Sequence, residues 1–86
     1  IRQGIEHDLL KSGIFRSVTT TEQKLTVDFT AETSDRDCRD VALKLGRLFS
    51  VVNPDGWVTV CILVKGQKRY ELDYSQADGV KAERNF

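Results

Sequence analysis

Apolar residues recur along the chain at helical spacing in two segments. In residues 1–12 they stand at every fourth position, at Ile1, Ile5 and Leu9. Spacings of three and four mark a second and stronger stripe, made of Cys38, Val41, Ala42, Leu45, Leu48, Phe49 and Val52. Ser34 precedes this stripe and suits a helix N-cap. We therefore predict a short amphipathic helix at the start of the chain and a longer, core-facing helix after Ser34.

Four further segments have the composition or the alternation of β-strands. They are residues 14–21, 24–31, 57–65 and 68–75. The third segment carries Val58, Val60, Ile62 and Val64 on one face, and Trp57, Thr59, Cys61 and Leu63 on the other. Apolar side chains on both faces are typical of a strand in the middle of a sheet. Asn53-Pro54-Asp55-Gly56 has the composition of a turn, which separates this strand from the second helix.

The order of elements is helix, two strands, helix, two strands. Two helices packed on one face of a four-stranded, mainly antiparallel sheet would bury both apolar stripes, so we predict this α+β fold. A chain of 86 residues fills about one hydrophobic core. Residues 1–75 are therefore expected to form a single domain. Residues 76–86 are polar and lack an apolar stripe, so they are expected to form a flexible C-terminal tail.

Composition excludes several classes of function. Thirteen basic and thirteen acidic residues balance to a formal charge of zero, and their signs alternate along the chain, which argues against nucleic-acid binding. The longest apolar-leaning stretch, residues 57–64, is far shorter than the ~20 residues of a membrane-spanning helix, so no membrane insertion is expected. The chain starts at Ile1 and contains no methionine. We expect a processed protein or a domain of a larger one, and we favour an extracytoplasmic location.

The residues that usually carry catalysis are sparse. His7 is the sole histidine, and on a helix it points about 100° away from the neighbouring Asp8, so the pair is not expected to act together. Cys38 and Cys61 are too isolated for a metal site, and their predicted positions on opposite faces of the sheet disfavour a disulfide. We expect two buried or half-buried thiols, no enzyme activity, no metal and no cofactor. One alternative stays open, because the N-terminus of a helix can lower the pKa of a thiol such as Cys38 and make it reactive.

Two groups of residues are candidates for binding. The first is the sheet face that carries Trp57, Thr59, Cys61 and Leu63, which two helices on the other face would leave uncovered. The second is a basic hairpin tip with Lys65, Lys68 and Arg69, which suits a phosphate or an acidic partner. We predict a non-catalytic interaction or assembly module that binds another protein or a neighbouring domain through the sheet face. Binding of nucleic acid or a phosphate ligand by the tip is the alternative, and self-association stays open. The chain carries no motif that identifies a family.

Overall fold

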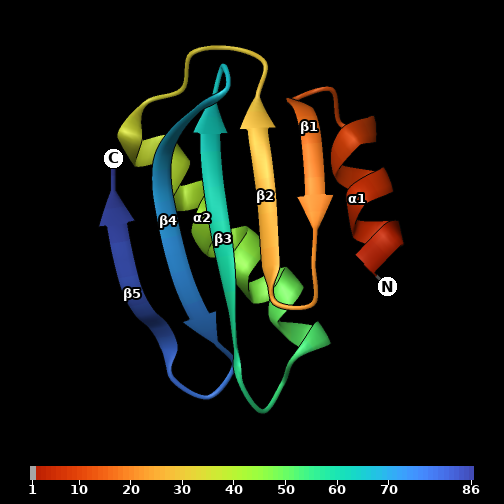
Figure 1. Ribbon diagram of the computed structural model, residues 1–86, viewed down its shortest axis with the longest axis vertical. Helices are drawn as coiled ribbons and strands as arrows, with labels where there is room; N and C mark the ends of the chain where they lie inside the picture. Colours follow the sequence, from red (N-terminus) through yellow and green to blue (C-terminus); the bar gives the residue numbers. More distant parts are fainter. Residues whose placement is uncertain (1) are drawn as a thin grey trace.

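The computed structural model describes residues 2–86, and Figure 1 shows their arrangement. The helices are α1 (Arg2–Lys11) and α2 (Asp35–Phe49), and α2 continues into a 3-10 turn, η1 (Ser50–Val52). The strands are β1 (Phe15–Thr20), β2 (Lys24–Phe29), β3 (Trp57–Val64), β4 (Gln67–Ser75) and β5 (Gly79–Asn85). They form a single five-stranded sheet in the order β1-β2-β3-β4-β5.

The sheet is mixed, and its class agrees with the predicted α+β fold. β2 and β3 are parallel, because α2 lies between them in the chain and returns it to the same end of the sheet. The other three neighbouring pairs, β1–β2, β3–β4 and β4–β5, are antiparallel. The prediction of four strands is one strand short.

The fifth strand lies where a flexible tail was expected. Residues 79–85 form β5 and pair with β4 from Tyr70↔Asn85 to Ser75↔Gly79. Pattern analysis missed this strand because every side chain of β5 is at least partly exposed. Its place in the fold depends on backbone hydrogen bonds and on charged side chains, which leave no apolar alternation in the sequence.

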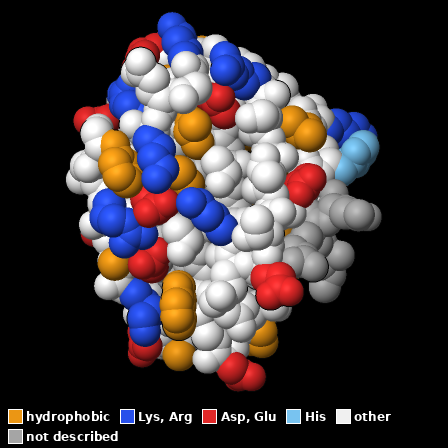
Figure 2. Space-filling model, viewed as in Figure 1, with side chains coloured by type: hydrophobic (Ala, Val, Ile, Leu, Met, Phe, Trp, Pro, Cys, Tyr) orange, Lys and Arg blue, Asp and Glu red, His pale blue; other side chains and the backbone are white. Residues whose placement is uncertain are grey.

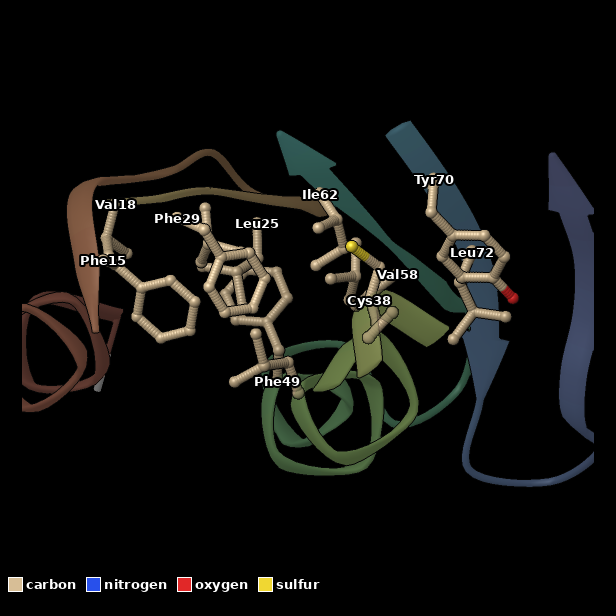
Figure 3. Close-up of a cluster of buried hydrophobic side chains, with 14 of the residues drawn as sticks. Phe15, Val18, Leu25, Phe29, Cys38, Phe49, Val58, Ile62, Tyr70 and Leu72 are labelled. Atoms are coloured by element: carbon tan, nitrogen blue, oxygen red, sulfur yellow. The ribbon is translucent and has the colours of Figure 1, made fainter. Parts of the chain in front are cut away.

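Both helices lie on the same face of the sheet, and the core fills the space between them and the strands (Figure 3). In β3 the predicted alternation is confirmed, since Val58, Val60, Ile62 and Val64 all point toward the helices and are buried. The neighbouring strands and α2 complete the core with Leu25, Val27, Phe29, Cys38, Ala42, Phe49, Tyr70 and Leu72, among others. The alternate residues of each strand therefore point to the other side of the sheet, which no helix covers.

The long helix begins as the sequence predicts. The Ser34 hydroxyl accepts a hydrogen bond from the backbone N–H of Asp37 at 3.1 Å, which satisfies one of the free amides of the first turn. Cys38, Ala42 and Phe49 lie in the core, whereas Leu48, which shares their stripe in sequence, is exposed. The stripe is therefore narrower in the structure than in the sequence.

The edge strand β1 contains a β-bulge that the sequence did not reveal. The register of β1 against β2 shifts between Phe15 and Ser17, so Phe15 and Val18 both point toward the core although they are three positions apart. Ile14, four positions before Val18, is exposed. The bulge therefore explains which side chains of β1 face the core, although the apolar residues of this strand do not alternate in the sequence.

Candidate interaction surface

The face of the sheet opposite the helices is the candidate site, and we call it the open face. Its side chains come from alternate positions of the five strands, and they include Thr19, Lys24, Thr26, Asp28, Trp57, Thr59, Cys61, Leu63, Lys68, Glu71, Asp73, Ala82 and Arg84. Figure 2 shows this face, with basic and acidic side chains alternating over β4 and β5 and few charged side chains over β2 and β3.

A network of charged side chains occupies the centre of the open face. Arg84 on β5 donates from Nε to Glu71 at 2.7 Å and from its two terminal nitrogens to the Asp73 carboxylate at 2.9 and 3.3 Å. The ammonium groups of Lys24 and Lys68 lie 3.5 and 3.9 Å from the other Glu71 oxygen. The forked guanidinium thus ties β5 to β4 through two carboxylates.

The network holds both carboxylates in their charged form. Burial by itself would raise the pKa of Glu71, but the hydrogen bond from Arg84 and the charges of Arg84, Lys24 and Lys68 together keep that pKa below 4.5. The hydrogen bond from Arg84 is the main reason that the pKa of Asp73 lies below 3.8. Thr59 adds to the effect, since its hydroxyl donates to Asp73 at 2.8 Å. Near neutral pH this surface therefore carries fixed, paired charges.

The four binding residues predicted on β3 share the open face but do not form a continuous apolar patch. Trp57 is exposed at one end of the strand, and Leu63 is half-buried at the other, about 20 Å away by the usual rise of a strand. Between them Thr59 is bonded to Asp73, and Cys61 is only 1% exposed. The open face is consequently a band of paired charges with an apolar group near each end, and not a continuous apolar surface.

The two cysteines are free thiols buried on opposite faces of the sheet. Cys38 belongs to α2 and its side chain lies in the core, whereas Cys61 lies on the open face. Burial is the largest influence on both and raises each pKa above 9.0, and the Arg69 charge near Cys38 offsets it only in part. A raised pKa does not favour the alternative of a reactive Cys38 thiolate, and the carboxylates of Asp35, Asp37 and Glu32 raise the pKa further.

We expect neither thiol to react with a disulfide reagent such as Ellman's reagent in the native protein at pH 8, because both sulfurs are buried and protonated. Unfolding in urea should release the full reactivity of both cysteines. The measurement is the absorbance of the released thiolate, with and without denaturant. Rapid native labelling that disappears in a Cys38→Ala variant would instead support the thiol-dependent alternative.

The residues of the predicted basic tip do not converge on one point. Lys65 and Gly66 form the tight turn between β3 and β4, with φ angles of 52° and 83°. Beyond this turn Lys68 lies on the open face near Glu71. Arg69 lies on the helix side, where it pairs with Glu32 at 2.8 Å and with Asp35 at 3.3 Å. The turn thus directs its cations to different faces, where two of them already have acidic partners.

The remaining candidates for chemistry do not assemble. His7 is an exposed residue of α1, which packs against β1 at the edge of the sheet opposite β5 and Arg84. Among residues 2–86, no group of three or more His, Cys, Asp or Glu side chains is placed to hold a metal ion. In the same part of the chain, neither helix is long and apolar enough to cross a lipid bilayer.

Sequence reasoning overlooked the residues at the centre of the open face. Glu71 and Asp73 alternate with Tyr70 and Leu72, so the sequence predicts that the two carboxylates lie on the polar face of β4. Arg84, which joins them, lies in the segment predicted to be a tail. Its role depends on the pairing of β5 with β4, in which Arg84 is the direct neighbour of Glu71.

Comparison with known proteins adds no relative of this chain, since no protein-family model, no curated protein and no solved structure matches it.

Proposed function

We propose that this chain is a non-catalytic interaction or assembly module, which binds another protein or a neighbouring domain through the open face of its sheet. The observation that carries the proposal is the exposure of Trp57. Its side chain remains 48% exposed on the face that the helices leave free. An indole is costly to leave in water and is the side chain most enriched among the residues that dominate binding energy.

The size of the open face supports the same proposal. The described chain measures 34 × 27 × 16 Å, and the view down its shortest axis looks directly onto the sheet. A surface of these two longer dimensions can supply the ~800 Å² that each partner contributes to an interface of standard size. A partner that covers it would contact Trp57 and reach the half-buried Leu63 at the far end of β3.

The charged network suits the centre of such an interface. Arg84, Glu71 and Asp73 are already joined by hydrogen bonds in the free protein. Because these side chains are ordered before binding, they lose less conformational entropy when a partner contacts them. The paired charges also penalise a partner that does not offer matching polar groups, which favours specificity.

The experiment compares two serine substitutions of equally exposed apolar residues. Trp57 lies on the open face, and Leu48, which is 49% exposed, lies on α2 on the helix side. The partner is first isolated on the immobilised wild-type domain from its native source, and its affinity is then measured by calorimetry. Loss of a tryptophan contact that dominates binding costs about 2 kcal/mol or more, so Trp57→Ser should weaken binding by roughly thirtyfold or more.

The Leu48→Ser control should bind as the wild type does. Circular dichroism should show native secondary structure in both variants, because neither side chain is buried. Equal affinities of the wild type and Trp57→Ser would refute binding through this face. Unfolding of Trp57→Ser would refute it as well, since it would give the indole a role in the core.

Phosphate or nucleic-acid binding by the hairpin tip has weaker support. Of its cations, Lys68 and Arg69 already pair with acidic groups on opposite faces. A gel shift at low salt, with the affinity falling steeply as salt is added, would favour that alternative over the open face.

A further inference from the structure

The last strand is attached to the domain differently from the other four. Each of β1 to β4 places apolar side chains in the core, for example Phe15 and Val18 of β1 at the opposite edge and Tyr70 and Leu72 of β4. In β5 every side chain is half-buried or exposed. The strand thus adds little to the hydrophobic stabilisation of the fold.

On the open face β5 is held by Arg84 alone among its charged side chains. That guanidinium bonds to Glu71 and Asp73 of β4, and Lys24 and Lys68 also neighbour Glu71. Arg84 itself is 41% exposed. Ion pairs of exposed cations are weakened by salt and contribute modestly to stability.

On the helix face β5 is held by Glu83. Its carboxylate accepts from Arg39 of α2 at 2.8 Å and from the hydroxyl of Tyr70 of β4. At the C-terminal end the Phe86 amide donates to the carbonyl of Arg69 at 3.2 Å, and the Lys68 ammonium lies 4.8 Å from the centre of the Phe86 ring. The side-chain contacts on both faces of β5 are therefore mainly between polar or charged groups.

We propose that β5 is a detachable edge strand, which separates from β4 as a unit while β1 to β4 and both helices remain folded. Local opening of this kind occurs where a segment buries little apolar area and its contacts are open to solvent. The four-stranded remainder keeps the whole apolar cluster, because its members come from α1, α2 and β1 to β4. Detachment uncovers the backbone hydrogen-bonding groups on the outer edge of β4, which β5 otherwise occupies.

Acid and salt should both promote the opening. Acid protonates Glu71, Asp73 and Glu83, which removes the acceptors of Arg84 and Arg39, and salt screens the same pairs. Glu71 and Asp73 of β4 face Arg84, and Arg39 of α2 faces Glu83. Lys24 and Lys68 also lie beside Glu71.

Native-state hydrogen exchange followed by NMR tests the proposal within one molecule. The amides that join β4 to β5 are compared with those that join β1 to β2, the equivalent pair at the opposite edge. We expect the β4–β5 amides to exchange at least about tenfold faster, corrected for sequence, because β1 is anchored by buried side chains and by α1. Raising salt from about 0.05 M to about 0.5 M should widen that ratio.

Two matched variants separate detachment from general loss of stability. Arg84→Gln removes the guanidinium of β5, and we expect it to speed β4–β5 exchange by roughly another tenfold relative to β1–β2. Arg16→Gln removes a similar ion pair, Arg16 to Asp28 at 2.9 Å, on the same face near the other edge. It should leave β4–β5 exchange unchanged.

Equal exchange at the two edges of the wild-type sheet would overturn the proposal, since β5 would then open only when the whole domain unfolds. A ratio that does not respond to salt would overturn it too. These wild-type measurements decide the question even if a variant fails to fold.

Discussion

Replacing Phe49 with alanine should lower the free energy of unfolding by about 3–5 kcal/mol, the usual cost of removing a fully buried phenyl ring. Phe49 is 0% exposed at the end of α2 and lies against the sheet close to Leu25 and Phe29 (Figure 3). The loss combines the apolar area returned to water with the cavity that remains. Urea unfolding followed by circular dichroism measures it directly.

The neighbouring residue is a matched control for this substitution. Leu48 belongs to the same helix turn but is 49% exposed, so Leu48→Ala should change the free energy of unfolding by no more than about 0.5 kcal/mol. Equal effects of the two substitutions would mean that α2 does not present Phe49 to the core as described.

The second large effect should appear at alkaline pH. Burial, followed by the hydrogen bond to Glu83, raises the pKa of Tyr70 from 10.0 to about 12. The unfolded chain therefore loses this proton at a lower pH than the folded chain does. Stability from this group is complete below pH 10 and is lost as pH rises from 10 to about 12. The linked loss is roughly 2–3 kcal/mol.

Tyr70→Phe removes the ionising group and should lose that part of the alkaline instability, although it also gives up the hydrogen bond to Glu83. Urea midpoints at pH 9 and pH 11.5 compare the two proteins. A spectrophotometric titration gives an independent reading, because the folded wild type should show a tyrosine ionisation with a midpoint near pH 12 that Tyr70→Phe lacks. Ionisation of Tyr70 near pH 10 in the folded protein would contradict the expectation.

Strongly patterned segments were predictable because their burial leaves a periodic trace. The alternation from Val58 to Val64 placed β3 in the centre of the sheet and identified the face beneath the helices. Ser34 predicted the start of α2 because an N-cap depends only on contacts within the first turn of the helix. The α+β class follows from these elements together.

Features that depend on contacts between residues distant in the sequence could not be predicted from local patterns. The bulge between Phe15 and Ser17 depends on the register of β1 against β2, so the sequence of β1 does not show which of its side chains face the core. The sequence showed that Cys38 is near the N-terminus of a helix, but it did not show how deeply the thiol is buried. That burial is the largest cause of its raised pKa.

The candidate site was predictable only in part. The face of β3 that remains free of helices, and the exposure of Trp57 on it, could be expected from alternation and the count of helices. The burial of Cys61 among charged side chains could not, because Lys24, Glu71 and Arg84 come from three different strands.

By itself the sequence determined, through the periodicity of its apolar side chains, the two helices, the central strand and the face of that strand that binds the helices. Only the tertiary structure decided that the polar C-terminal segment joins the sheet and that charged side chains of different strands pair on the open face. The physical reason is that apolar burial is encoded by neighbours along the chain, whereas ion pairs such as Arg84 with Glu71 and Asp73 depend on strand register.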